Sequence, residues 1–226
     1  NLARGFVEEV ERRYAGTAQG RQELDGILPQ DEEGALWSQS VLDSIRVEAA
    51  PSLDRIVVGV DPAVTSGEGA DITGIVVVGV SDQGPDGLRA WVLEDASLKG
   101  STNEWARAAL AARLRHGADR IVVEANQGGD TIKTVLLNLD PTAPITSVHA
   151  VQSKALRAEP VAALYEQGRV RHLRGLGALE EQMGRMTRDG FRGRGSPDRV
   201  DALVWALTEA LVTPLSRQRD PRLRHL

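Results

Sequence analysis

The sequence predicts an α/β fold in which a mixed central sheet is flanked by helices. Two apolar, β-branched runs come first, Ile56 to Val60 and Ile75 to Val80, separated by a connection rich in Gly, Pro, Ser and Thr. Strand-like and helix-like segments alternate from there onward. Both runs are continuously apolar, which is typical of strands in the middle of a sheet that is covered on both faces.

Three more strands follow along the chain. We expect a turn over Asp82 to Gly87 and then a strand over Ala90 to Glu94, so the first three strands form an antiparallel meander. Arg120 to Glu124 is again a β-branched run that ends in an acid, and Ile145 to Val151 is expected to be the fifth strand. Helical segments separate these later strands, which therefore favours parallel pairing.

Helices are predicted by their end signals. Ser101 to Glu104 is a capping box ahead of an Ala-rich helix that runs to about His116. A helix over Asp130 to Leu139 follows. The apolar residues from Leu156 to Gln167 suit a helix that Pro160 interrupts early, and Gly168 is placed to cap it.

The last two helices supply further core residues. Three- and four-residue spacing predicts one helix over Leu176, Leu179, Met183 and Met186, with both methionines in the core. Ser196 at the N-cap and Pro197 at the first helical position begin the final helix. Its expected buried stripe is Val200, Leu203, Val204, Leu207 and Leu211.

The chain divides into three parts. Residues 1–50 show little apolar periodicity and are expected to be a linker segment that packs onto another part, with a short helix over Ser38 to Ile45. Residues 51–213 form the α/β domain. Residues 214–226 are an Arg-rich tail, which we expect to be flexible.

Composition excludes several chemistries. There is no cysteine, so disulfides, thiolate zinc sites and cysteine nucleophiles are ruled out. The four histidines are scattered, so any metal is held mainly by carboxylates, which suits Mg²⁺ or Mn²⁺. No apolar window approaches the length of a membrane span, and the charged N-terminus is unlike a signal peptide, which predicts a cytosolic protein. The formal net charge of -5 disfavours nucleic-acid binding, although arginines cluster between Arg185 and Arg194.

Three acids have matching placements. Asp61 and Glu124 each end an apolar strand, and Asp201 begins a helix that could pack across the sheet, with Asp198 on the same face. Each has a structural interpretation: Asp61 with Pro62 can start a turn, Glu124 can cap a loop with Asn126, and acids in a first helical turn favour the helix dipole. Converging carboxylates stay ionised when a cation neutralises them, and two divalent ions can hydrolyse a phosphodiester. We therefore expect a shared carboxylate site.

Five motifs follow one another along the chain. They are Val58-Gly-Val-Asp61-Pro-Ala, Asp71-Ile-Thr-Gly-Ile, Ile121-Val-Val-Glu124-Ala-Asn-Gln-Gly-Gly-Asp130, Ser153-Lys-Ala-Leu-Arg-Ala-Glu-Pro and Ser196-Pro-Asp198-Arg-Val-Asp201-Ala-Leu-Val-Trp-Ala-Leu. In this combination and order the chain resembles the C-terminal nuclease half of the DNA-packaging terminase large subunit of viruses and virus-like gene transfer particles. The similarity covers about residues 51–212.

The resemblance implies a ribonuclease H-like fold and an endonuclease that cuts double-stranded DNA with two divalent cations, Mg²⁺ or Mn²⁺. Asp61, Glu124 and Asp201 would be the catalytic metal ligands, and Asp198 an accessory ligand. Asp71 is interpreted as structural. The residues implied to lie near DNA are Lys154, Arg157, Arg188, Arg192 and Arg194.

The resemblance also implies partners: an ATPase motor, a small terminase subunit and a portal or capsid in the host cytoplasm. The sequence departs from the full family pattern because the motor and its phosphate loop are missing, so this chain should not hydrolyse ATP. Residues 1–50 resemble the junction between motor and nuclease. Three alternatives stay open: a junction resolvase, an actin-like ATPase, and a non-catalytic module that docks DNA or the portal.

Overall fold

A computed structural model of the chain describes residues 32–63, 72–82, 87–125 and 129–215. The remaining residues lie outside this description. They include Asp71, most of the turn expected over Asp82 to Gly87, and the tail beyond residue 215. None of the helices in the described ranges combines the length and the apolar character that a bilayer crossing needs.

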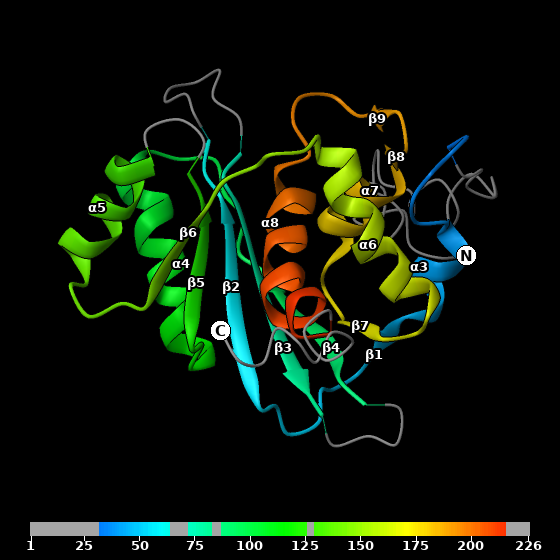
Figure 1. Ribbon diagram of the computed structural model, residues 1–226, viewed down its shortest axis with the longest axis horizontal. Coiled ribbons are helices and arrows are strands. Elements are labelled where there is room, and N and C mark those ends of the chain that lie inside the picture. Colours follow the sequence, from blue (N-terminus) through cyan, green and yellow to red (C-terminus); the bar gives the residue numbers. More distant parts are fainter. Residues whose placement is uncertain (1–31, 64–71, 83–86, 126–128, 216–226) are drawn as a thin grey trace, which may run out of the picture.

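A seven-stranded mixed sheet forms the centre of the fold, in the order β1-β7-β4-β3-β2-β5-β6 (Figure 1). The strands β2, β3 and β4 pair antiparallel, whereas the pairs β2–β5, β5–β6, β4–β7 and β1–β7 are parallel. The predicted meander followed by parallel strands is therefore confirmed. The strands are β1 Arg46–Val47, β2 Arg55–Asp61, β3 Gly74–Ser81, β4 Arg89–Asp95, β5 Arg120–Glu124, β6 Ile145–Val148 and β7 Val170–Leu173.

Helices cover both faces of this sheet. In Figure 1, α4 and α5 lie on one face, and α6, α7 and α8 lie on the other. The helices are α3 Gln39–Ser44, α4 Thr102–His116, α5 Gly129–Leu139, α6 Lys154–Glu166, α7 Gly177–Gly184 and α8 Asp198–Leu207, and one π-helical turn, η1 Thr208–Val212, continues α8. A small hairpin, β8 Met186–Thr187 and β9 Gly190–Phe191, lies between α7 and α8.

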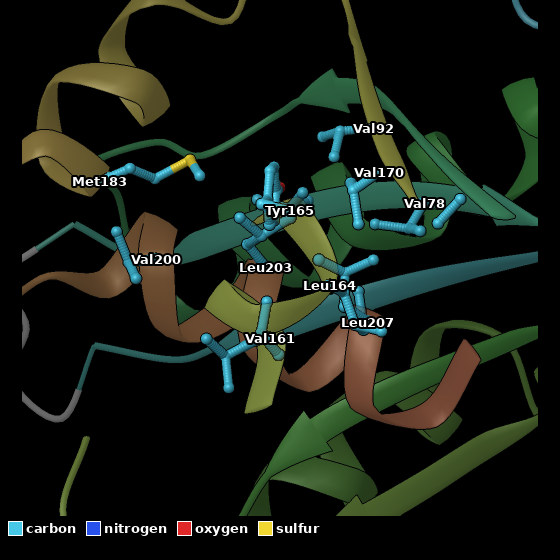
Figure 2. Packing of buried hydrophobic residues seen from close by; sticks show 14 of the residues in the cluster. Val78, Val92, Val161, Leu164, Tyr165, Val170, Met183, Val200, Leu203 and Leu207 are labelled. Carbon is cyan, nitrogen blue, oxygen red and sulfur yellow. The ribbon is translucent and has the colours of Figure 1, made fainter. Parts of the chain in front are cut away.

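Successive residues of the central strands contribute to two separate cores. Val57 and Val76 belong to the core beneath α6, α7 and α8, whereas Val58 and Val77 belong to the core beneath α4 and α5. Figure 2 shows the first core, in which side chains of α6 and α8 meet valines of the sheet. All eight residues of β3 are buried, which confirms that the continuous apolar runs mark strands covered on both faces.

Several predicted elements are confirmed with small changes of boundary. Glu104 Oε2 accepts a hydrogen bond from the backbone N–H of Ser101 at 2.7 Å, so the predicted capping box forms. Gly168 follows α6 with a φ of +66°, a left-handed conformation that suits a residue just after a helix. However, α6 runs through Pro160 without interruption, and β6 ends at Val148 rather than Val151.

The final helix begins later than the sequence suggests. Its first residue is Asp198, and Pro197 occupies the N-cap position. The Ser196 hydroxyl accepts a hydrogen bond from Lys154 Nζ at 2.8 Å, and so does not cap the helix. Gln182 supplies part of the cap, because its side-chain oxygen accepts from the backbone N–H of Arg199 at 3.1 Å. The predicted buried stripe of this helix is confirmed.

The helix predicted around the two methionines is shorter than expected, since Met186 begins β8. Both methionines are nevertheless buried in the core, as predicted. The described residues before position 50 are part of the same packing: Trp37, Leu42 and Ile45 are buried, and β1 pairs with β7 at the edge of the sheet. The packed unit therefore begins before the boundary predicted at residue 50.

Candidate functional site

Two strand ends bring the first two acids together. Asp61 is the last residue of β2, and Glu124 is the last residue of β5. These strands are parallel neighbours with Val60 opposite Val123, so both acids lie at the same edge of the sheet. Beyond Asp61, Thr73 Oγ1 accepts from the Ala63 N–H at 3.1 Å and holds the outgoing chain against the start of β3.

The first turn of α8 brings the other two acids. Asp198 and Asp201 are three residues apart and lie on one face of the helix. The helix packs directly over β2 and β3 because Gly59 and Gly74 present no side chain there: a Cβ at Gly74 would collide with the carbonyl oxygen of Asp198. The structure therefore gathers all four predicted acids where β2 and β5 end and α8 begins.

All four acids are largely removed from solvent. Their exposed fractions are 9% for Asp61, 9% for Glu124, 7% for Asp198 and 1% for Asp201. Burial, followed by repulsion from Asp201, raises the pKa of Asp61 to about 8 despite the opposing charge of Lys154. Burial also raises the pKa of Asp201, although Lys154 and Arg157 oppose this effect. The buried carboxylates therefore need positive charge nearby in order to stay ionised.

Lys154 supplies part of that charge from the first residue of α6. Its Nζ lies 2.5 Å from Asp201 Oδ2 and 3.7 Å from Asp61 Oδ2. Burial opposes the ammonium charge, but Asp201 and Asp61 outweigh it and raise the pKa of Lys154. The ammonium group is thus held between two of the predicted metal ligands.

Arg157 supplies a second cation, one helical turn further along α6. Its Nη1 donates to Glu124 Oε2 at 3.1 Å and its Nη2 donates to Asp201 Oδ1 at 3.0 Å. The side chain is only 8% exposed. In this structure, therefore, Arg157 joins two acids, and its place near DNA stays a prediction.

The donor set suits hard divalent cations. Carboxylate oxygens are the ligands that Mg²⁺ and Mn²⁺ prefer, and the chain has no thiolate that could favour a softer metal. Within the described ranges, no three Asp, Glu or His side chains already converge on one point as a metal centre. The acids are instead joined through Lys154 and Arg157. The residues present thus fit a metal that would replace the Lys154 ammonium between Asp61 and Asp201, and their assignment as ligands stays a prediction.

The predicted DNA-facing arginines lie on and after the small hairpin. Arg188, Arg192 and Arg194 are all exposed. Arg192 Nη2 lies 3.6 Å from Asp189 Oδ2, an exposed pair that solvent screens. Figure 1 places β8 and β9 toward the same end of the molecule as the start of α8. The structure thus offers exposed positive charge on the side where the acids lie.

Two contributors to the site were not predicted. Trp205 Nε1 donates to Glu124 Oε2 at 2.5 Å, and Arg199 Nε donates to Asp95 Oδ2 at 2.8 Å beside the start of α8. Trp205 lies in a stretch of apolar residues, so its spacing indicates only a core position. One available signal was its place four residues after Asp201, which puts both on one helix face.

A family model described as the terminase RNase H-like domain matches residues 58–210 of this chain. A search of curated proteins finds no match. The matched range contains all four acids, Lys154, Arg157 and the exposed arginines of the hairpin.

Solved structures share the fold at low sequence identity. The large terminase nuclease from the thermophilic phage G20c with bound magnesium is 17% identical, with a TM-score of 0.55, over 79% of this chain and 98% of that one. The manganese-soaked human cytomegalovirus terminase nuclease domain is 14% identical, with a TM-score of 0.55, over 79% and 97%. A large terminase from another thermophilic bacteriophage, in complex with ADP, is 12% identical, with a TM-score of 0.57, over 93% of this chain and 52% of that one.

Proposed function

Because the chain belongs to the terminase RNase H-like domain family, we propose that it is a divalent-metal-dependent endonuclease that cuts double-stranded DNA during the packaging of a genome into a capsid. The observation that carries this proposal is the meeting of Asp61, Glu124 and Asp201 at one edge of the sheet. They come from β2, β5 and α8, three elements far apart in the sequence.

Buried like charges of this kind destabilise the fold unless a cation compensates them. Asp61, Glu124 and Asp201 would hold two ions, Mg²⁺ or Mn²⁺, with Asp198 as an accessory ligand. When bound, such ions activate a water molecule and stabilise the leaving oxygen of a phosphodiester. The structures with magnesium and manganese among its relatives support this choice of metals.

The two cations of α6 have distinct roles in this proposal. Arg157 holds Glu124 and Asp201 in fixed orientations, because its two terminal nitrogens each bind one of them. Lys154 compensates Asp61 and Asp201 when no metal is bound, and its side chain is 40% exposed. Lys154 can therefore turn toward a DNA phosphate once a metal takes its place between the acids.

DNA would be held by its backbone. The exposed Arg188, Arg192 and Arg194 would contact phosphates, so affinity and cleavage should fall steeply as salt is added. In the part of the chain that the structure describes we see no recognition helix with base-reading side chains, and the sequence specificity should therefore be low.

The biological setting is also part of the proposal. This chain covers 52% of the phage large terminase that was solved with ADP, and this supports a nuclease that works with a separate or adjoining ATPase motor. A small terminase subunit and a portal or capsid are the further partners proposed, in the host cytoplasm.

The test is cleavage of supercoiled plasmid in Mn²⁺, Mg²⁺ or EDTA by the wild-type protein and by Asp61→Asn. The wild type should nick or linearise the plasmid with either metal and not in EDTA. The variant should lose at least about 100-fold in rate, the size of effect that follows the loss of several kcal/mol of transition-state stabilisation.

Asp119→Asn is the matched control. Asp119 lies just before β5, at the opposite end of that strand from Glu124, and accepts a hydrogen bond from the Ile56 N–H. An amide can still accept this bond, so the control should cut like the wild type. Equal cutting by Asp61→Asn would contradict the site assignment. DNA binding without cutting by any of the proteins would favour the non-catalytic docking module.

A further inference from the structure

Trp205 donates a hydrogen bond to a residue of the site, although its neighbours along α8 are apolar. It lies on α8 four residues after Asp201, and its ring is buried in the core beneath α6 and α7. The indole Nε1 donates to Glu124 Oε2 at 2.5 Å. Charge-assisted hydrogen bonds of this kind are shorter and stronger than neutral ones. The indole group is therefore bound directly to a predicted metal ligand.

Arg157 binds the same ligand from above the same ring. Its guanidinium carbon lies 4.5 Å from the centre of the Trp205 ring, a distance at which a cation is attracted to the aromatic face. Arg157 Nη1 reaches the same Oε2 atom of Glu124, at 3.1 Å. Two donors therefore converge on one oxygen, and Trp205 contacts both the carboxylate and its second donor.

We propose that Trp205 is a positioning residue of the metal site: its N–H fixes the orientation of the Glu124 carboxylate, and its ring face holds Arg157 in place to bind Glu124 and Asp201. The inference rests on the proposed function, since it takes Glu124 to be a metal ligand. Partners that orient metal ligands through hydrogen bonds typically contribute about 10- to 100-fold to metal affinity or activity.

If Trp205 served only in core packing, removal of its N–H would leave metal binding unchanged. One substitution distinguishes this packing role from the positioning role. Trp205→Phe keeps a buried aromatic ring on α8 but removes the N–H. Trp37→Phe is the matched control, because Trp37 is 1% exposed in the same core and the described residues supply no hydrogen-bond partner for its Nε1. Both substitutions remove similar apolar volume, and only one removes a donor to Glu124.

The experiment is calorimetric titration of Mn²⁺ into the metal-free proteins, with no DNA present. We expect Trp205→Phe to bind Mn²⁺ about 10-fold more weakly than the wild type, and Trp37→Phe to bind like the wild type. Equal affinity of Trp205→Phe and the wild type would overturn the inference and leave the proposed function intact. A wild type that binds no Mn²⁺ would overturn both.

A second measurement follows the wild-type protein alone, so it does not depend on whether a variant folds. The chain has four tryptophans, so a ¹⁵N-labelled wild type should give four indole N–H signals in a two-dimensional NMR spectrum. Adding Mg²⁺ should move the assigned Trp205 signal furthest, because its acceptor Glu124 becomes a metal ligand. A Trp205 signal that stays in place while Mg²⁺ binds would overturn the inference.

Discussion

At the residue scale, Asp61 is an acid of the site whose pKa is strongly perturbed. It is buried at a strand end with Asp201 as its main repulsive neighbour, and its pKa is raised to about 8 from an ordinary value of 3.8. Lys154 relieves this repulsion only in part. The charge of Asp61 therefore depends strongly on a nearby cation.

This raised pKa predicts how stability changes with pH in the absence of metal. Between about pH 4 and pH 8 the folded protein keeps a proton on Asp61 that the unfolded chain has lost. The resulting stabilisation is fully present below about pH 4 and is lost as the pH rises toward 8. In EDTA, the melting temperature of the wild type relative to Asp61→Asn should thus fall from pH 5 to pH 8.

The two proteins can be compared by calorimetry or circular dichroism over that pH range. Mn²⁺ at pH 8 should raise the melting temperature of the wild type and leave Asp61→Asn little changed, because only the ionised carboxylate binds the metal strongly. If the difference in melting temperature between the two proteins in EDTA is the same at pH 5 and pH 8, Asp61 does not titrate in this way.

The acids themselves could be predicted from the sequence, whereas their partners could not. Asp61 and Glu124 each follow a run of β-branched residues, and a charge at such a place indicates a strand end. Trp205 and Arg157 carry no such local signal, because a helical tryptophan indicates packing and a helical arginine indicates a solvated face. Only the approach of α6 to α8 makes them neighbours of Glu124.

At the scale of elements, the site depends on how closely α8 approaches the sheet. Gly59 of β2 and Gly74 of β3 lie directly beneath its first two turns, where an added Cβ would collide with the carbonyl oxygens of Ala202 and Asp198. These are backbone atoms, so the helix as a whole would have to move. Asp198 and Asp201 would move with it, away from Asp61.

Gly74→Ala should therefore destabilise the protein by about 1 to 3 kcal/mol, the usual cost of overpacking, and should also weaken cleavage. Gly177→Ala is the control, because a Cβ on this first residue of α7 would meet nothing within 4 Å. Urea unfolding in EDTA measures the first effect, and plasmid cutting measures the second. Gly74→Ala with the stability and activity of the Gly177→Ala control would contradict this account of the helix position.

Short elements were the least predictable part of the fold. The strand β7 has four residues that alternate between buried and half-buried, and β1 has only two, so neither carries a run long enough to stand out. Ser196 and Pro197 have the residue types of a helix start, yet Lys154 takes the serine hydroxyl as an acceptor. A tertiary contact thus outweighs the local capping preference at this position.

At the scale of the whole molecule, a chain of polar contacts fixes β1 to the rest of the fold and runs from the exposed Arg46 to the buried Glu180, His172 and Tyr165. Arg46 donates to Glu180 Oε2 from Nε and Nη2, at 2.9 and 2.7 Å. His172 Nδ1 lies 3.0 Å from Glu180 Oε1, and Tyr165 OH lies 2.8 Å from His172 Nε2. Burial lowers the pKa of His172, which keeps its ring neutral so that Nδ1–H donates to Glu180 and Nε2 accepts from Tyr165.

This chain of contacts joins β1 to α7, β7 and α6, and α6 carries Lys154 and Arg157. The sequence could not predict it, because Arg46 and Glu180 are 134 residues apart. If residues 1–50 adjoin a motor, as their resemblance to the motor–nuclease junction implies, these contacts offer a packed route from that segment to α6. Lys154 is the first residue of α6, and the polar contacts reach α6 near its other end, at Tyr165.

The central claim is that Asp61, Glu124 and Asp201 hold divalent metal, and it can be tested most directly by anomalous scattering from crystals soaked in MnCl₂. We expect anomalous peaks between these three carboxylates, with Lys154 Nζ displaced from Asp201 Oδ2, and no such peaks in Asp61→Asn crystals. Crystals that take up manganese elsewhere, or that keep Lys154 bound between Asp61 and Asp201 at saturating metal, would contradict the claim.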